Sequence, residues 1–190
     1  MGQKEREQLI NKRNEYLSEP SVGELSDECI KAIIDICEIT SPKSILELGF
    51  NRGVSALMWL KSSKAIIKSV DWRKIDKVEK SINYINTKYP NRFIYKELNH
   101  SKILDEKEGL YNLGENYDLV FIDGDHSVKA VDRDAKNSLE FNPQYLVFDD
   151  YKHRHHQAAI ENAIKSNPLE IIKEYDIWSG IVLCKNLNFK

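Results

Sequence analysis

The stretch SILELGFNRGVSALMWLKSS (44–63) joins a short apolar segment to a longer mixed one through a turn that holds two glycines. Residues 44–48 have the length and composition of a buried strand, and residues 54–63 are predicted to form a helix. Gly49 and Gly53 allow the chain to turn tightly between the two and let a ligand approach the backbone. The stretch therefore predicts a strand, a glycine turn and a helix in succession.

The same alternation of strands and helices continues after residue 63. Further strands are predicted at 65–72, 92–98, 118–123 and 145–150, with helices at 77–89, 128–141 and 156–166. Residues 169–177 and 180–185 are predicted to form a final antiparallel hairpin. Strands joined by helices make a parallel sheet that is covered on both faces. We therefore predict one α/β domain over residues 1–190, with a Rossmann-like, doubly wound, mostly parallel seven-stranded sheet, an antiparallel C-terminal hairpin and helices on both faces.

The composition is that of an ordinary globular protein. A length of 190 residues suits one domain with a real core. The formal net charge of −2 creates no strong field for nucleic acid or an anionic membrane. The three cysteines form no CxxC pair, and no apolar stretch is long enough to cross a bilayer. We expect a cytoplasmic protein without a membrane partner.

Polar residues gather at the predicted carboxyl ends of the strands, where ligands bind in sheets of this kind. The glycine turn leads into a helix N-terminus, which favours a negatively charged group. Asp71 ends the next strand, where a carboxylate can accept hydrogen bonds from both ribose hydroxyls of a nucleoside. Together these features favour a nucleoside-containing cofactor. The alternatives are that the glycines only close a turn and that Asp71 only caps the next helix.

Two apolar runs end in carboxylates. DLVFIDGDH (118–126) ends in Asp123, Asp125 and His126, and YLVFDDYKHRHH (145–156) carries Asp149 and Asp150 after its apolar run. Carboxylates at neighbouring strand ends repel one another unless a cation lies between them. Mg²⁺ prefers such hard oxygen ligands. The pattern therefore favours a divalent metal site.

The glycine turn ELGFNRG (47–53) lacks the G-x-G-x-x-G spacing of dinucleotide sites and resembles the first motif of class I S-adenosylmethionine-dependent methyltransferases. The resemblance implies that Glu47 and the glycines line the methionine part of the cofactor, while Asp71 holds the ribose. Trp72 could lie against adenine or pack over the sheet edge. The expected cofactor-binding residues are Glu47, Gly49, Phe50, Asn51, Gly53, Asp71, Trp72, Ser101 and Asp123.

The two acidic segments, DLVFIDGDHSVKAVDRD (118–134) and LVFDDY (146–151), resemble metal-dependent O-methyltransferases related to catechol methyltransferases. They are still more similar to a small group that includes macrolide-sugar methyltransferases and cephalosporin hydroxylase-like proteins. The resemblance implies a divalent ion, Mg²⁺ by expectation, held by Asp123, Asp149 and Asp150. It also implies that His126 is the general base. The segment FNPQY (141–145) departs from the family, because it keeps Pro143 but lacks the glycines usual in that turn.

We therefore expect methylation of a small hydroxylated acceptor, such as a sugar or a phenol. The N-terminal helices within residues 1–40, or a second subunit in a homo-oligomer, would cover the acceptor above the core of residues 44–185. Residues 151–156 could be a polar loop, a substrate contact or a zinc site. Trp178 could line the acceptor pocket or a dimer surface. Asp125 and Ser127 could simply cap the helix that follows, with His126 a solvated loop residue.

Other functions remain open on the sequence. A nucleic-acid or protein methyltransferase is one alternative, although the near-neutral charge and the IDGD segment (122–125) speak against a DNA-modifying enzyme. A nicotinamide enzyme is disfavoured by the spacing of the glycine turn. A module that binds S-adenosylmethionine without catalysis and works through a partner is a further alternative.

Overall fold

The structure is a computed structural model that describes residues 26–71, 76–98, 116–125, 127–153 and 155–190. The strands in these ranges are β1 Ser44–Leu48, β2 Ile66–Asp71, β3 Phe93–Glu97, β4 Leu119–Ile122, β5 Tyr145–Phe148, β6 Leu169–Tyr175 and β7 Ile181–Asn186. The helices are α3 Asp27–Thr40, α4 Val54–Ser62, α5 Asp76–Lys88, α7 Val128–Leu139 and α8 Gln157–Ser166. None of the described helices is long and apolar enough to cross a membrane.

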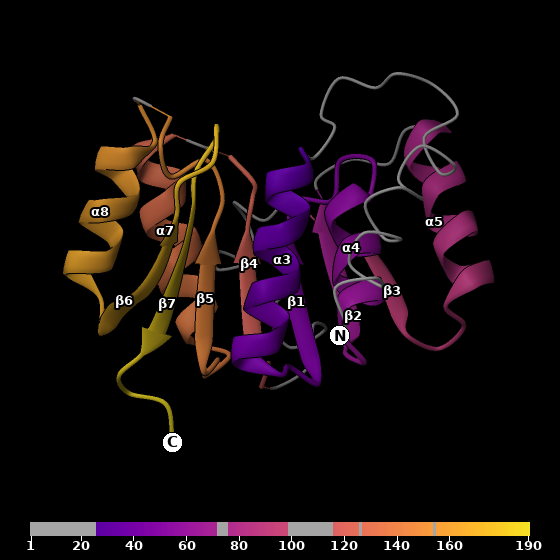
Figure 1. Cartoon of the computed structure of the whole chain (residues 1–190), viewed down its shortest axis with the longest axis horizontal. Helices are drawn as coiled ribbons and strands as arrows, with labels where there is room; N and C mark the ends of the chain where they lie inside the picture. Colours follow the sequence, from indigo (N-terminus) through magenta and orange to yellow (C-terminus); the bar gives the residue numbers. More distant parts are fainter. Residues whose placement is uncertain (1–25, 72–75, 99–115, 126, 154) are drawn as a thin grey trace.

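The seven strands form one sheet in the order β3-β2-β1-β4-β5-β7-β6. Strands β1 to β5 run parallel, whereas β7 is antiparallel to both β5 and β6 (Figure 1). The predicted mostly parallel sheet with an antiparallel C-terminal hairpin is confirmed. The strand order reverses between β1 and β4, and this reversal marks the usual ligand site of such sheets.

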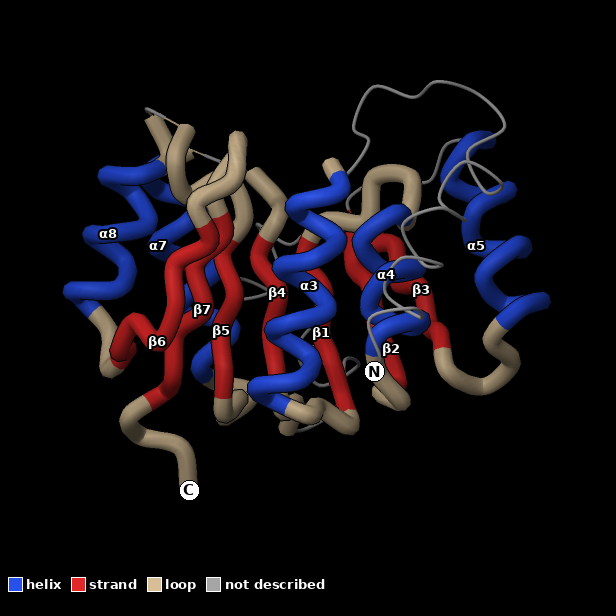
Figure 2. The backbone as a smooth tube through the Cα atoms, viewed as in Figure 1, coloured by secondary structure: helices blue, strands red, loops and turns tan. Residues whose placement is uncertain are grey.

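The two faces of the sheet carry separate apolar layers. Helices α3, α4 and α5 contribute to one layer, and α7 and α8 contribute to the other (Figure 2). Strand β4 serves both layers, because Leu119 and Phe121 join the first while Val120 and Ile122 join the second. Side chains alternate between faces along a strand, so a strand buried on both sides is apolar throughout.

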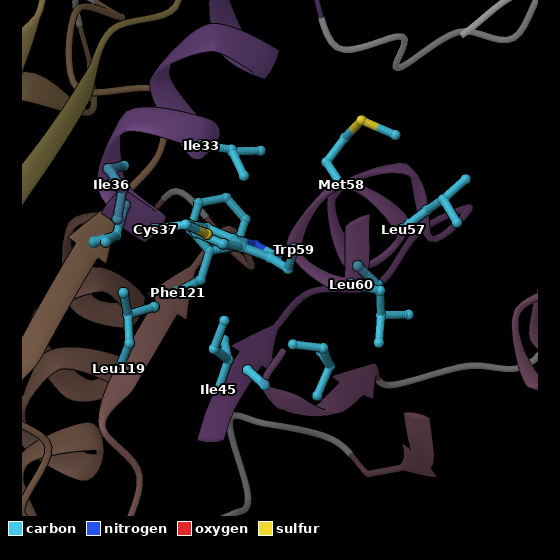
Figure 3. Close-up of a cluster of buried hydrophobic side chains, with 14 of the residues drawn as sticks. Ile33, Ile36, Cys37, Ile45, Leu57, Met58, Trp59, Leu60, Leu119 and Phe121 are labelled. Atoms are coloured by element: carbon cyan, nitrogen blue, oxygen red, sulfur yellow. The ribbon is translucent and has the colours of Figure 1, made fainter. Parts of the chain in front are cut away.

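The centre of the first layer is Trp59 of α4, which is fully buried. Its ring meets the ring of Phe121 edge-on, with the ring centres 5.4 Å apart. Ile33 and Ile36 of α3 lie close to this pair (Figure 3). Large apolar side chains from a helix, a strand and a second helix therefore fix α3 and α4 against the sheet.

Helix α3 belongs to the core of the domain. Its buried side chains include Ile30, Ile33, Ile34 and Cys37, which recur at the spacing of one helix face. The helix ends at Thr40, and Ser41 takes a left-handed conformation before Pro42. The prediction that N-terminal helices cover an acceptor site concerns residues 1–25 as well, and these lie outside the described residues.

Candidate active site

The carboxyl ends of β4 and β5 lie side by side and place two aspartates at the same level. Ile122 pairs with Phe148 at the end of the two strands, and the Asp149 amide donates to the Ile122 carbonyl over 3.1 Å. The Asp123 amide donates to the Leu48 carbonyl at the end of β1 over 2.9 Å. The backbone thus brings together the strand ends that the two acidic motifs predicted.

The glycine turn packs directly against the end of β4. Gly49 has a φ of +99°, and a Cβ atom there would lie 2.0 Å from the Asp123 carbonyl oxygen. Gly53 has a φ of +74°, and a Cβ atom there would lie 2.4 Å from the Phe50 ring. Only glycine combines such φ values with such close approaches. The turn is therefore specified sterically and lies next to Asp123.

Asp71 holds the glycine turn in place. Its Oδ2 atom accepts hydrogen bonds from the backbone N–H groups of Phe50 over 2.9 Å and Asn51 over 2.7 Å. The Phe50 side chain is buried, and its ring contacts the ring of Tyr95 with centres 5.1 Å apart. Phe50 and Asn51 are predicted to contact the cofactor, and in the structure their backbone N–H groups donate to Asp71. The sequence feature that could have predicted this contact is the carboxylate at the end of the strand that follows the glycine turn.

Glu47 is fully buried at the end of β1 and receives a hydrogen bond from the Ser69 hydroxyl. Burial raises its pKa to about 7, while hydrogen bonding from Ser55 and Ser69 opposes the rise and the charge of Asp71 adds to it. A buried carboxylate is costly unless a partner satisfies it. A cationic or hydrogen-bond-donating group of a ligand at this strand end would therefore stabilise the buried Glu47 carboxylate.

The three predicted metal ligands influence one another electrostatically. Burial and the charges of Asp149 and Asp150 hold the pKa of Asp123 well above its usual range, and Glu47 and Asp71 add to this effect. Burial and the charge of Asp150 raise the pKa of Asp149 to about 7. Carboxyl groups are thus concentrated at the carboxyl ends of these strands, and a cation there would favour their ionised forms.

The donor chemistry at this edge fits a hard divalent ion. Asp149 Oδ1 is buried and has no hydrogen-bond partner among the residues that the structure describes. The neighbouring acidic side chains offer oxygen atoms, which Mg²⁺ prefers. In the described ranges, however, no group of three histidine, cysteine, aspartate or glutamate side chains is arranged so that it could hold a metal ion. The site has suitable donors nearby but no preformed three-ligand cage.

The turn between β6 and β7 also reaches this site. Hydrogen bonding from the Ser179 side chain opposes the rise in the pKa of Asp149. Asp150 takes a left-handed conformation with a φ of +57°, and its Oδ2 lies 3.7 Å from Nδ1 of His156. His156 belongs to the segment 151–156, for which the sequence left a substrate contact open, whereas Ser179 was not assigned to the site. A serine about thirty residues from its partner carries no local signal, because only the antiparallel strand pairing brings it close.

The remaining predicted residues fall into two groups. His126, Trp72 and Ser101 lie outside the described residues. Asp125 accepts a hydrogen bond from the Ser127 backbone N–H over 2.9 Å, next to the start of α7. This contact matches the helix-start role that the sequence left open for Asp125.

Comparison with known proteins identifies the family. A family profile described as a methyltransferase domain matches residues 46–151, whereas no curated protein matches the sequence. Among solved structures, the O-methyltransferase of Bacillus cereus in complex with SAH is similar with a TM-score of 0.67 and 16% identity, over 98% of this chain and 92% of that chain. The SAH-bound methyltransferase of Podospora anserina gives a TM-score of 0.69 and 16% identity, over 93% of this chain and 86% of that chain.

A putative RNA methyltransferase from Pyrococcus horikoshii has the same TM-score of 0.69 with 10% identity, over 97% of this chain and 99% of that chain. At such identities the structural likeness establishes the fold and does not decide the acceptor. The family profile goes further, because it spans more than half of the chain and includes the glycine turn and both acidic strand ends. This chain belongs to the methyltransferase-domain family.

Proposed function

We propose that the chain transfers the methyl group of S-adenosylmethionine to an oxygen atom of a small hydroxylated acceptor, such as a sugar or a phenol. One observation carries the proposal: the glycine turn and the acidic ends of β1, β4 and β5 meet where the strand order reverses. The SAH bound to two structural neighbours supports the choice of cofactor.

In this proposal, the methionine end of the cofactor lies along Glu47 and the glycine turn. Glu47 would interact with the cofactor's ammonium group, which would compensate for the burial of its carboxylate. Asp71 would keep the turn in its binding shape through the two amides and would face the ribose. Trp72 and Ser101 would contact the adenine end.

We further propose that Asp123, Asp149 and Asp150 hold a divalent ion. Mg²⁺ is the expected ion, because it prefers oxygen ligands. When bound, such an ion makes an acceptor hydroxyl more acidic and orients it. The methyl carbon leaves the sulfur as it bonds to the acceptor oxygen, and the hydroxyl proton passes to a base, for which we propose His126. Ser179 would orient Asp149 during this reaction.

Thermal unfolding with S-adenosylhomocysteine, S-adenosylmethionine, NAD and ATP, each with Mg²⁺ and with a chelator, tests the cofactor and the metal together. A ligand at a hundredfold its dissociation constant adds about 2.7 kcal/mol. At this chain length the midpoint should rise by roughly 5 to 10 °C. We expect a rise with the two adenosyl-sulfur ligands alone, and a larger one with Mg²⁺. No rise with either of them would make a non-catalytic module that works through a partner the better description.

A variant pair separates the metal site from the cofactor site. Asp149→Ala should abolish methyl transfer while the stabilisation by S-adenosylhomocysteine remains. Asp149 follows β5, and β4 separates β5 from β1 and the glycine turn. Asp132→Ala is the matched control, since Asp132 lies on α7 and pairs with Lys136 at the surface. Full activity of Asp149→Ala, or full activity of the natural protein in excess chelator, would contradict the metal assignment.

A further inference from the structure

Trp178, in the turn between β6 and β7, exposes its side chain to solvent. Its relative exposure is 86%, whereas Trp59 is fully buried. Apolar surface of this size gains free energy when it is covered, so an exposed indole is a favourable contact for a ligand or a partner. Its immediate surroundings are polar, because Lys152, His153 and Asp176 are all exposed.

A row of rings connects this indole with the acidic site. The rings of Trp178 and His153 meet edge-on, with centres 5.5 Å apart and an interplanar angle of 85°. The ring of His153 lies 5.4 Å from that of His156. His156 Nδ1 in turn lies 3.7 Å from Oδ2 of Asp150. The exposed indole is therefore linked through His153 and His156 to Asp150, a carboxylate of the proposed metal site.

The turn that carries Trp178 is fixed to the loop that carries Asp150. The Tyr151 amide donates to the Gly180 carbonyl over 3.0 Å, and the Lys152 amide donates to the Ser179 carbonyl over 2.8 Å. Lys152 also forms an ion pair with Asp176. A Cβ atom on Gly180, whose φ is +74°, would lie 2.7 Å from the Lys152 nitrogen, so the two segments are in direct contact.

Ser179 directly follows Trp178, and its side chain lowers the pKa of the Asp149 carboxyl. The same turn therefore carries the exposed indole and the serine side chain that acts on Asp149.

We propose that Trp178 and His153 recognise the acceptor by lying against a six-membered ring, aromatic or sugar, that carries the hydroxyl group to be methylated. This inference rests on the proposed function and adds the side chains that select the acceptor. An indole supplies a large, rigid contact face at little entropic cost, and neighbouring polar groups orient the bound ring. A second protein is less suited to this surface, because stable interfaces need about 800 Å² per partner and one indole in polar surroundings falls well short.

Acrylamide quenching of tryptophan fluorescence gives a readout that does not depend on activity. The quenchable signal of Trp178 is obtained by subtracting the signal of Trp178→Phe from that of the natural protein. With S-adenosylhomocysteine and Mg²⁺ present, we titrate a panel of dihydroxybenzenes and, separately, a panel of methyl glycosides. Protection by the first panel identifies a phenolic acceptor, and protection by the second identifies a sugar. Protection by neither panel overturns the inference.

Kinetics with the protecting compound complete the test. Trp178→Ala should raise the KM for that acceptor about tenfold, as expected for an aromatic contact residue, with kcat unchanged, and Trp178→Phe should restore most of the loss. Phe189→Ala is the matched control, because Phe189 is another exposed aromatic residue, and it follows β7 at the amino ends of the parallel strands. An unchanged KM in Trp178→Ala overturns the inference even if methylation proceeds. Failure of the natural protein to bind S-adenosylhomocysteine would instead overturn the proposed function.

Discussion

Asp71 and Asp118 use the same chemistry at opposite ends of the parallel strands. Asp71 Oδ2 accepts two backbone N–H groups from the glycine turn at the carboxyl ends of the strands. Asp118 Oδ2 accepts the N–H groups of Lys43 over 2.7 Å and Ser44 over 3.0 Å at the amino end of β1. Comparing variants of the two residues therefore distinguishes the contribution of such a carboxylate to stability from its contribution to cofactor binding.

Asp71→Ala and Asp118→Ala should each lower the free energy of unfolding by about 2 kcal/mol, because each removes charge-assisted hydrogen bonds to two amides. Only Asp71→Ala should also weaken the binding of S-adenosylhomocysteine, since only Asp71 shapes the proposed cofactor turn. Urea denaturation and isothermal titration calorimetry measure the two effects. Equal loss of affinity in both variants would show that Asp71 acts through general stability alone.

Glu47 should make the protein less stable as the pH rises from 5 to 8. Burial raises its pKa from an ordinary value of 4.5 to about 7, so the folded state holds a proton that the unfolded state releases. The stabilisation is complete below pH 4.5 and is lost as the pH rises through 7. For a shift of this size the change is on the order of 3 kcal/mol.

Glu47→Gln, which carries no titratable proton, should flatten the dependence of the unfolding free energy on pH. Part of the slope should remain, because the pKa of Asp149 is also raised to about 7. Glu170→Gln on the exposed face of β6 is the control and should leave the slope unchanged. Urea denaturation at pH 5 and pH 8 gives the comparison, and an unaltered slope in Glu47→Gln would show that the carboxyl does not titrate in this range.

At the scale of elements, two helices begin at a serine but use it differently. The Ser26 hydroxyl accepts a hydrogen bond from the Cys29 N–H over 3.2 Å at the start of α3. Ser127 stands at the start of α7, and its side chain makes no capping bond there. Asp125 instead accepts the N–H of Ser127. The same residue type therefore occupies equivalent positions with and without the capping contact.

Ser26→Ala should lower the free energy of unfolding by about 1 kcal/mol, the usual contribution of a helix cap. Ser127→Ala should change it far less, because no side-chain capping bond is lost. Guanidinium denaturation of the two variants provides the test. A larger loss in Ser127→Ala than in Ser26→Ala would contradict the assigned caps.

For the molecule as a whole, charge is distributed unevenly despite a net value of −2. Carboxylates lie at the carboxyl ends of at least four neighbouring strands, namely Glu47, Asp71, Asp123, Asp149 and Asp150. Phosphate backbones are recognised mainly by basic side chains, whose contacts weaken steeply as salt is added. We therefore expect the described carboxyl ends of these strands to be poorly suited to nucleic acid.

The full chain should therefore show no appreciable affinity for RNA or DNA oligonucleotides at physiological ionic strength. Fluorescence anisotropy with labelled single-stranded and double-stranded probes, at several salt concentrations and with S-adenosylhomocysteine present, makes the measurement. Tight binding that weakens steeply with salt would instead support a nucleic-acid acceptor, as in the structurally similar putative RNA methyltransferase.

The sequence by itself determined the alternation of strands and helices, the position of the glycine turn and the acidic strand ends. These features are local: buried parallel strands need short apolar runs, and a tight turn against Asp123 needs Gly49. The family follows from the same segments, because the matched profile spans residues 46–151.

Only the tertiary structure decided which residues support the site. Asp71 reaches the amides of the glycine turn because β1 and β2 are parallel neighbours. Ser179 and Trp178 come to the Asp149–Asp150 segment because β7 pairs antiparallel with β5. Such contacts join residues some twenty to thirty positions apart. Their partners are selected by strand order and pairing, and no local pattern of residues encodes that selection.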